Sequence, residues 1–116
     1  MLVVDDEPNI RLLLKRIFEN EFTVLEAKNG KEAFATAQRQ IPSVILMDIM
    51  MPESDGLSAL NDMKMCKETC TIPVIMLTGV GHELNERLAT SIGADGYMKK
   101  PIKPQELIDA VKRLLV

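Results

Sequence analysis

The sequence predicts an α/β fold, a single (βα)5 doubly wound parallel sheet. Short apolar segments alternate with longer segments whose apolar residues recur at helical spacing, and a few residues connect one segment to the next. The short segments are rich in β-branched residues and apolar at successive positions, as parallel strands covered on both faces require. Alternating strands and helices join through right-handed crossovers, which place helices on both faces of one sheet.

The first two units begin with the expected strands at residues 2–4 and 22–25. Pro8 suits the first turn of the helix that follows, where its missing N–H is harmless. The apolar face of this helix has the spacing i, i+3, i+4, i+7 and i+8; it consists of Ile10, Leu13, Leu14, Ile17 and Phe18. Asn29 and Glu32 resemble a capping box at the start of the second helix. Its weaker apolar face consists of Ala33, Phe34 and Ala37.

The other three units follow the same order, with expected strands at 44–47, 74–77 and 96–98. Gly93 suits a left-handed helix end, and Pro104 suits a first helical turn. The expected helix faces are Leu57, Leu60 and Met63, then Leu84, Leu88 and Ile92, then Leu107, Val111, Leu114 and Leu115.

The composition of the 116 residues, 47% hydrophobic and 27% charged, is that of one globular domain. A net charge of −3 and 3% aromatic residues argue against direct binding of nucleic acid. The aliphatic run 44–47 is far too short to span a membrane, and no basic start leads into an apolar stretch. Two cysteines give no disulfide framework. We therefore expect a cytoplasmic domain that does not bind membranes.

Polar side chains follow four of the five expected strands. Asp5 and Asp6 follow the first strand, Asp48 the third, Thr78 the fourth and Lys100 the fifth. Ligands of an open parallel sheet bind outside the carboxyl ends of its strands. The sequence therefore predicts that three carboxylates, a hydroxyl and an ammonium group meet at one edge of the sheet.

Such a cluster of carboxylates needs a cation or shared protons. An all-oxygen site that keeps several waters suits Mg²⁺. A carboxylate beside this ion can act as a nucleophile towards a phosphoryl group, while the ion and a lysine offset the charge of the transferring oxygens. Acidic residues at strand ends are also common in solvated loops and helix N-caps, and the residues alone leave that interpretation open for each of them.

Four motifs occur at a specific spacing: Val-Val-Asp-Asp-Glu-Pro at 3–8, Val-Ile-Leu-Met-Asp-Ile-Met-Met-Pro at 44–52, Asp-Gly at 55–56 and Lys-Pro at 100–101. With this set, the chain resembles the receiver domains of bacterial two-component response regulators over essentially its whole length. The resemblance implies a flavodoxin-like strand order, 2-1-3-4-5, and one receiver domain over residues 1–116.

By this resemblance, Asp48 is the phosphoacceptor, which takes a phosphoryl group from a histidine kinase or a phosphotransfer protein. Asp5, Asp6, Asp48 and the backbone carbonyl of Met50 would hold Mg²⁺. The domain would not be an enzyme with a separate substrate, but a phosphoacceptor that assists its own phosphorylation and dephosphorylation.

The resemblance also assigns the residues that transmit and end the signal. Thr78 and Lys100 match the pair that contacts the phosphoryl oxygens, and Tyr97 matches the aromatic switch residue. The surface of helix 4, strand 5 and helix 5 would change on phosphorylation and be recognised by an output domain, a downstream protein or a second copy in a homodimer. Met50 and Val80 match positions that line the approach of hydrolytic water.

Three other functions compete with this interpretation. Phosphatases that form an aspartyl-phosphate of the haloacid-dehalogenase type need a second Asp two residues after the nucleophile, where Met50 stands. Receiver-like modules that are never phosphorylated usually lack one of the acids, the Thr or the Lys, and all of these are present here. A nucleotide-binding domain would have a glycine-rich first loop instead of Asp-Asp-Glu-Pro at 5–8.

Overall fold

The computed structural model of the chain describes residues 1–49, 51, 56–79 and 83–115, with 83–85 described by their backbone. In these residues, parallel strands form a five-stranded sheet in the order β2-β1-β3-β4-β5. The strands are β1 (Leu2–Val4), β2 (Leu25–Ala27), β3 (Ile45–Asp48), β4 (Val74–Thr78) and β5 (Gly96–Lys99). The helices are α1 (Pro8–Phe18), α2 (Gly30–Gln40), α3 (Gly56–Met65), α4 (Glu83–Ile92) and α5 (Pro104–Leu114). The predicted doubly wound sheet and its strand order 2-1-3-4-5 are confirmed.

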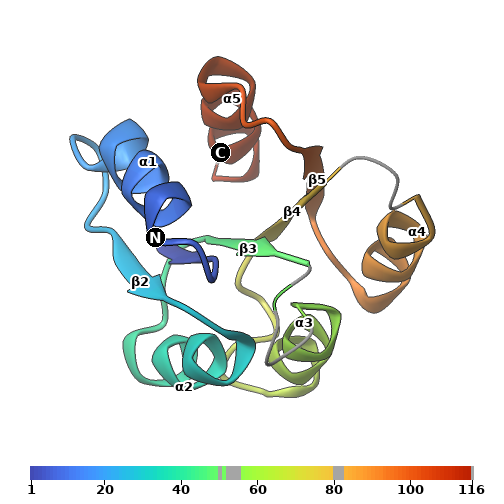
Figure 1. Cartoon of the computed structure of the whole chain (residues 1–116). Helices are drawn as coiled ribbons and strands as arrows, with labels where there is room; N and C mark the ends of the chain where they lie inside the picture. Colours follow the sequence, from blue (N-terminus) through green and yellow to red (C-terminus); the bar gives the residue numbers. More distant parts are fainter. Residues whose placement is uncertain (50, 52–55, 80–82, 116) are drawn as a thin grey trace.

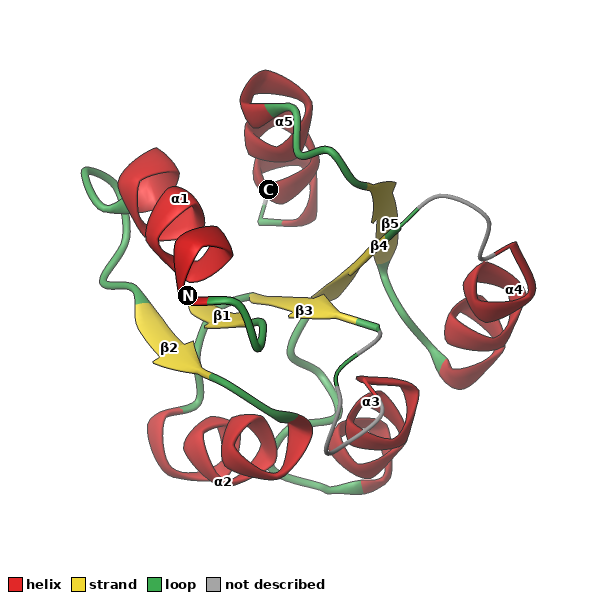
Figure 2. Ribbon diagram, viewed as in Figure 1, coloured by secondary structure: helices red, strands yellow, loops and turns green. Residues whose placement is uncertain are grey.

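The sheet lies between two layers of helices (Figure 1). Helices α1 and α5 cover one face, and α2, α3 and α4 cover the other (Figure 2). Side chains along a strand point alternately to the two faces. In β4, Val74 and Met76 pack with the α2–α3–α4 layer, whereas Ile75 and Leu77 pack with the α1–α5 layer. The continuous apolar runs of the sequence are therefore strands buried on both faces.

The second strand begins later than the sequence pattern predicts, at Leu25 instead of residue 22. Phe22 belongs to the turn after α1, where its backbone N–H donates to the Phe18 carbonyl at 2.9 Å. The rings of Phe18 and Phe22 pack edge to face with centroids 5.9 Å apart. Phe22 thus packs against the core of the α1–α5 layer without belonging to a strand. A short apolar run looks the same in the sequence in both cases.

Three leucines that the helical pattern assigns to inward faces are exposed: Leu13 of α1 is 39% exposed, Leu88 of α4 is 44% exposed, and Leu115, which follows α5, is 40% exposed. The residues that follow Leu13 and Leu88 are fully buried: Leu14, which the pattern also assigns to the inward face, and Ala89, which it does not. Successive residues of a helix lie about 100° apart around its axis. A helix that turns Leu14 or Ala89 to the sheet therefore leaves the preceding leucine on its flank.

The ends of the helices follow the predicted signals. Helices α1 and α5 begin at Pro8 and Pro104. At the start of α2, Asn29 Oδ1 accepts a hydrogen bond of 2.8 Å from the Glu32 N–H. Gly93, with φ of +123°, ends α4 in a backbone conformation that favours glycine.

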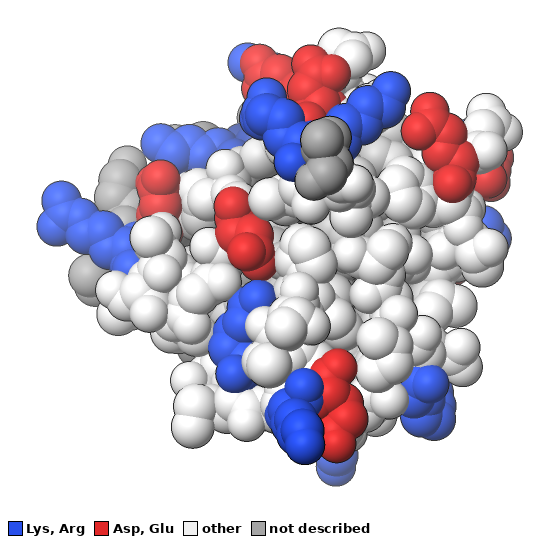
Figure 3. Space-filling model, turned by 180° about the vertical axis from the view of Figure 1, so that it is seen from behind, with Lys and Arg blue, Asp and Glu red and all other residues white. Residues whose placement is uncertain are grey.

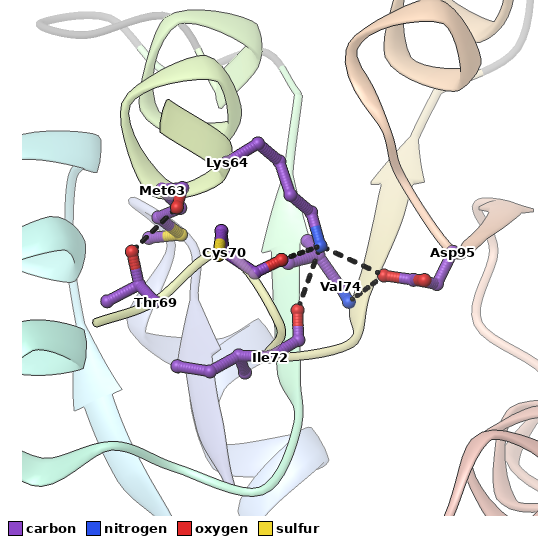
Figure 4. A network of polar contacts seen from close by, with 7 residues as sticks. All are labelled: Met63, Lys64, Thr69, Cys70, Ile72, Val74 and Asp95. Atoms are coloured by element: carbon purple, nitrogen blue, oxygen red, sulfur yellow. Dashed lines mark hydrogen bonds and ion pairs between the residues drawn. The ribbon is translucent and has the colours of Figure 1, made fainter. Parts of the chain in front are cut away.

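Lys64, near the end of α3, ties three segments together at the amino ends of the strands (Figure 4). Its Nζ donates to the carbonyl oxygens of Cys70 at 3.4 Å and Ile72 at 3.0 Å, and to Asp95 Oδ2 at 3.2 Å. The same Asp95 oxygen accepts the N–H of Val74, the first residue of β4, at 2.9 Å. This Lys64 network (Lys64, Cys70, Ile72, Val74 and Asp95) joins α3, the segment before β4 and the turn before β5.

Charged side chains of both signs are interspersed around a broad uncharged area on the face opposite the view of Figure 1 (Figure 3). None of the helices in the described residues combines the length and the apolar character that a membrane crossing requires.

Candidate functional site

The predicted site residues meet at the carboxyl edge of the sheet. Asp48 is the last residue of β3, and Thr78 is the last residue of β4. Asp5 directly follows β1, and Lys100 directly follows β5. Because β1, β3, β4 and β5 are consecutive neighbours and parallel, their carboxyl ends lie side by side. The strand order thus brings together residues that are 95 positions apart in the chain.

Three carboxylates form the centre of this edge. Asp5, Asp6 and Asp48 each contribute one oxygen to a group whose atoms lie within 4.8 Å of one another. Asp5 is fully buried and Asp48 is 5% exposed, whereas Asp6 is exposed. A compact, all-oxygen donor set that is open to water on one side fits a hard cation such as Mg²⁺, which binds few carboxylates and keeps its waters.

Lys100 lies between two of these carboxylates. Its Nζ is 3.0 Å from Asp5 Oδ2 and 3.5 Å from Asp48 Oδ2. Partial burial lowers the pKa of the Lys100 ammonium, but the hydrogen bond to Asp5 and the charge of Asp48 outweigh burial and raise this pKa above its usual value. The ammonium group of Lys100 is therefore positively charged and lies beside the carboxylates that would also attract a metal ion.

Asp5 is held through both of its carboxylate oxygens. Oδ1 accepts a hydrogen bond of 2.9 Å from the Glu7 N–H, and Oδ2 accepts one of 3.0 Å from Lys100. The Asp5 N–H donates to the Ala27 carbonyl at 3.2 Å, which continues the pairing of β1 with β2 beyond the strand ends. Two hydrogen bonds thus orient this buried carboxylate, and β2 holds the backbone of the same residue.

Thr78 combines complete burial with an unused hydroxyl. Its side chain is 0% exposed, and Oγ1 has no hydrogen-bond partner among the described residues. Buried polar groups are usually paired, and a lone one deserves a functional explanation. The hydroxyl lies on the strand next to the one that ends in Asp48, so it is available to an acceptor bound at that edge.

Tyr97 lies in β5, opposite Met76 in the register of β4 and β5. Its ring is partly buried and packs against the α2–α3–α4 layer. Met50 and Val80, the expected hydrolysis-tuning residues, lie outside the described residues, as does the Met50 carbonyl expected to bind the metal.

Gly56, the first residue of α3, contacts the backbone at the end of β3. Its N–H donates to the Ile49 carbonyl at 2.8 Å. A Cβ added to Gly56 would collide with the carbonyl oxygen of Asp48 and lie 2.8 Å from the Ile49 Cα. The Asp-Gly motif at 55–56 is therefore explained in part by a close approach of two backbones, which only glycine permits.

Arg11 is a residue of this edge that the sequence analysis missed. Its Nη1 donates to the backbone carbonyl of Asp5 at 2.7 Å, and its Nε donates to Glu26 Oε1 at 3.2 Å. An arginine one turn into the helix that follows an Asp-Asp pair is the signal that could have indicated this contact. The contact joins α1, β2 and the loop after β1.

The comparisons with known proteins agree with this geometry. A family model of the response regulator receiver domain matches residues 1–112. The transcriptional regulatory protein SrrA of Staphylococcus aureus (strain NCTC 8325 / PS 47) is 43% identical over 116 residues, covering 99% of this chain and 47% of the relative. The chain thus spans about half the length of the curated relatives that it matches.

Solved structures show the same fold. The chemotaxis response regulator CheY4 of Vibrio cholerae matches with a TM-score of 0.90 at 30% identity, covering 98% of this chain and 96% of that one. The signal receiver domain of a signal transduction histidine kinase from Syntrophus aciditrophicus matches with a TM-score of 0.89 at 35% identity, covering 98% and 87%. The chain therefore belongs to the response regulator receiver domains of two-component systems.

Proposed function

We propose that residues 1–116 form a phosphorylation-dependent signalling switch in which Asp48 is the phosphoacceptor. One observation carries the proposal: the Asp48 carboxylate clusters with those of Asp5 and Asp6 within 4.8 Å, and the Lys100 ammonium lies 3.5 Å from it. A nucleophilic carboxylate, a cation site and a fixed positive charge are the parts that phosphoryl transfer to an acid requires.

Asp5, Asp6 and Asp48 would hold Mg²⁺, together with the backbone carbonyl of Met50. When bound, the ion offsets the negative charge on the phosphoryl oxygens. The three carboxylates of the site supply more negative charge than Lys100 alone can balance, which supports a divalent cation as the resident cofactor.

The phosphoryl donor would be a histidine kinase or a phosphotransfer protein. An oxygen of the Asp48 carboxylate attacks phosphorus, a P–O bond forms, and the P–N bond of the phosphohistidine breaks with its electron pair returning to the imidazole. The Lys100 ammonium faces Asp48 and stabilises the charge on the transferring oxygens. The domain thereby assists its own phosphorylation and later the loss of the group.

The hydroxyl of Thr78, which has no hydrogen-bond partner in the described residues, would report the modification. A phosphoryl group on Asp48 brings three strong acceptor oxygens, and the Thr78 hydroxyl can donate to one of them by moving towards it. Space opened by that movement lets Tyr97 turn further inward, which changes the surface of α4, β5 and α5.

The changed surface would be recognised by an output domain, a downstream protein or a second copy of the chain in a homodimer. The name of the Staphylococcus aureus relative supports an output that controls transcription through a part of the protein outside this chain. This domain itself would act in the cytoplasm, without direct contact to nucleic acid or membrane.

Incubation with acetyl phosphate and Mg²⁺ tests the proposal. Intact mass should increase by one phosphoryl group, and Asp48→Asn should abolish the increase. Asp62→Asn, which changes an exposed aspartate of α3, is the matched control and should be labelled like the parent chain. Labelling that persists in Asp48→Asn would contradict the assignment of Asp48 as the phosphoacceptor.

A further inference from the structure

Arg11 contacts the backbone of the loop after β1, which contains Asp5 and Asp6. Its side chain is 18% exposed, and its guanidinium group bridges the Asp5 carbonyl at 2.7 Å and the Glu26 carboxylate at 3.2 Å. Glu26 lies in β2, in register with Val3 of β1. The guanidinium is therefore oriented by the sheet, and its planar set of donors holds the two acceptors in fixed directions.

The carbonyl that Arg11 holds belongs to the peptide group joining Asp5 to Asp6. Rotation of this peptide plane would move the two carboxylates relative to each other. The Asp5 side chain is fixed by Glu7 and Lys100, but Asp6 is exposed, so its position depends on the backbone. Fixing this one peptide sets the separation of two carboxylates of the cluster.

We propose that Arg11 is a positioning residue for divalent-cation binding, which it controls by fixing the Asp5–Asp6 peptide. The inference rests on the proposed function of the site as a Mg²⁺ site. The inference and simple electrostatics predict opposite changes in the affinity for Mg²⁺ when Arg11 is removed. A nearby positive charge repels a cation, so its removal would strengthen binding if charge alone mattered. Loss of positioning weakens binding.

The test compares Arg11→Met and Arg11→Lys with the matched control Arg16→Met, which changes an exposed arginine of the same helix. Mg²⁺ is titrated into each unphosphorylated protein, and the dissociation constant is taken from the amide shifts of residues 5–7. Arg11→Met should bind Mg²⁺ about tenfold more weakly, as is typical when an outer-shell partner of a metal ligand is lost.

Arg11→Lys keeps the charge but replaces the planar guanidinium with a single ammonium group. The affinity of this variant for Mg²⁺ should therefore fall between those of Arg11→Met and the parent chain. Arg16→Met should bind like the parent. Thermal unfolding in EDTA is measured alongside, because a purely structural contact would lower the melting temperature and leave the affinity for Mg²⁺ unchanged.

Unchanged or tighter binding by folded Arg11→Met would overturn the inference. Should Arg11→Met fail to fold, Arg11→Lys decides, and parent-like affinity in that variant would overturn it equally. Failure of the proposed function has a different signature, because the parent chain itself would then show no saturable Mg²⁺ binding at residues 5–7 and no phosphorylation of Asp48.

Discussion

Lys100 and Asp5 form an ion pair of 3.0 Å across 95 positions of the chain, and Asp5 is completely buried. The same Asp5 carboxylate belongs to the cluster of three carboxylates that could hold a cation. If the site functions as proposed, Lys100 would have two opposed effects: its charge would compete with a metal ion for Asp5, and the same charge would favour phosphoryl oxygens at Asp48.

Lys100→Met should separate these two effects. Mg²⁺ should bind about tenfold more tightly or better, because the competing ammonium is gone. Phosphorylation by acetyl phosphate should slow on the order of 10²-fold, because a preorganised charge is lost. Lys103→Met is the control, since that side chain is 69% exposed, and it should change neither quantity. Weaker Mg²⁺ binding in Lys100→Met would contradict the competition.

Thr78 and Thr69 are a matched pair, because both are 0% exposed but only one uses its hydroxyl. Thr69 Oγ1 donates to the Met63 carbonyl at 2.6 Å, whereas Thr78 Oγ1 has no partner in the described part of the chain. Thr69→Val should lower the free energy of unfolding by about 1–3 kcal/mol, and Thr78→Val should leave it unchanged or raise it by about 1 kcal/mol. Urea denaturation measures both.

The same Thr78→Val variant should accept phosphate and fail to transmit the change. Amide shifts of α4 and β5 on adding beryllofluoride should be much smaller than in the parent chain, because the hydroxyl that moves towards the phosphoryl oxygen is absent. A full response of these two elements would show that the coupling runs through other groups.

Gly56→Ala should disturb the phosphoacceptor itself. The new methyl group meets backbone atoms of Asp48 and Ile49, which must shift, so we expect a loss of about 1–3 kcal/mol in stability and slower phosphorylation. Gly96→Ala is the control, because its methyl group would lie 3.2 Å from a side-chain atom of Ile75, which can adjust. Similar phosphorylation rates in both variants would argue against the supporting role of Gly56.

Met50 and Val80 lead to a prediction about the lifetime of the signal. Both side chains are apolar and cannot orient a water molecule for attack on phosphorus. We expect slow loss of phosphate from Asp48, and the exchange of Met50→Asn with Val80→Glu should accelerate it by at least roughly tenfold, which is ~1.4 kcal/mol in the barrier. Decay is followed by intact mass after removal of the phosphodonor. Equal or slower decay in the double variant would refute this account.

Lys64→Met should destabilise the fold without affecting phosphoryl transfer. It leaves the Cys70 and Ile72 carbonyls and the Asp95 carboxylate without their shared donor, which should cost on the order of 1–3 kcal/mol in the free energy of unfolding. The rate of phosphorylation should stay at the parent value, because the Lys64 network lies at the other edge of the sheet. Lys67→Met, at an exposed position, is the control for stability.

The sequence predicted the central strands well because β1, β3 and β4 are buried on both faces, and burial leaves a continuous apolar run. It misplaced β2, an edge strand whose middle residue Glu26 is exposed. Strand ends of a parallel sheet share an edge, so the meeting of Asp5, Asp48 and Lys100 could be predicted from their positions alone.

Contacts from side chains to backbone carbonyls could not be predicted in this way. Arg11 and Lys64 both donate to backbone carbonyl oxygens six to eight positions away. Every residue has such a carbonyl, so the sequence does not show which one a side chain will reach. In α4, Ala89 is buried and Leu88 is exposed. The apolar spacing of the helix does not show which of these two residues faces the sheet.

Gly93 lies where α4 ends, and it is followed within two residues by Asp95, which the Lys64 network holds. The carboxyl end of α4 is thus held beside the Lys64 network, while the other end lies towards the edge that contains Asp48. Ten helical residues span about 15 Å. A tilt of about 10° about the carboxyl end would displace the start of the helix by about 2.6 Å over that length. In the proposed switch, a small shift of the Thr78 hydroxyl would thereby become a displacement of α4 as large as an atom's diameter.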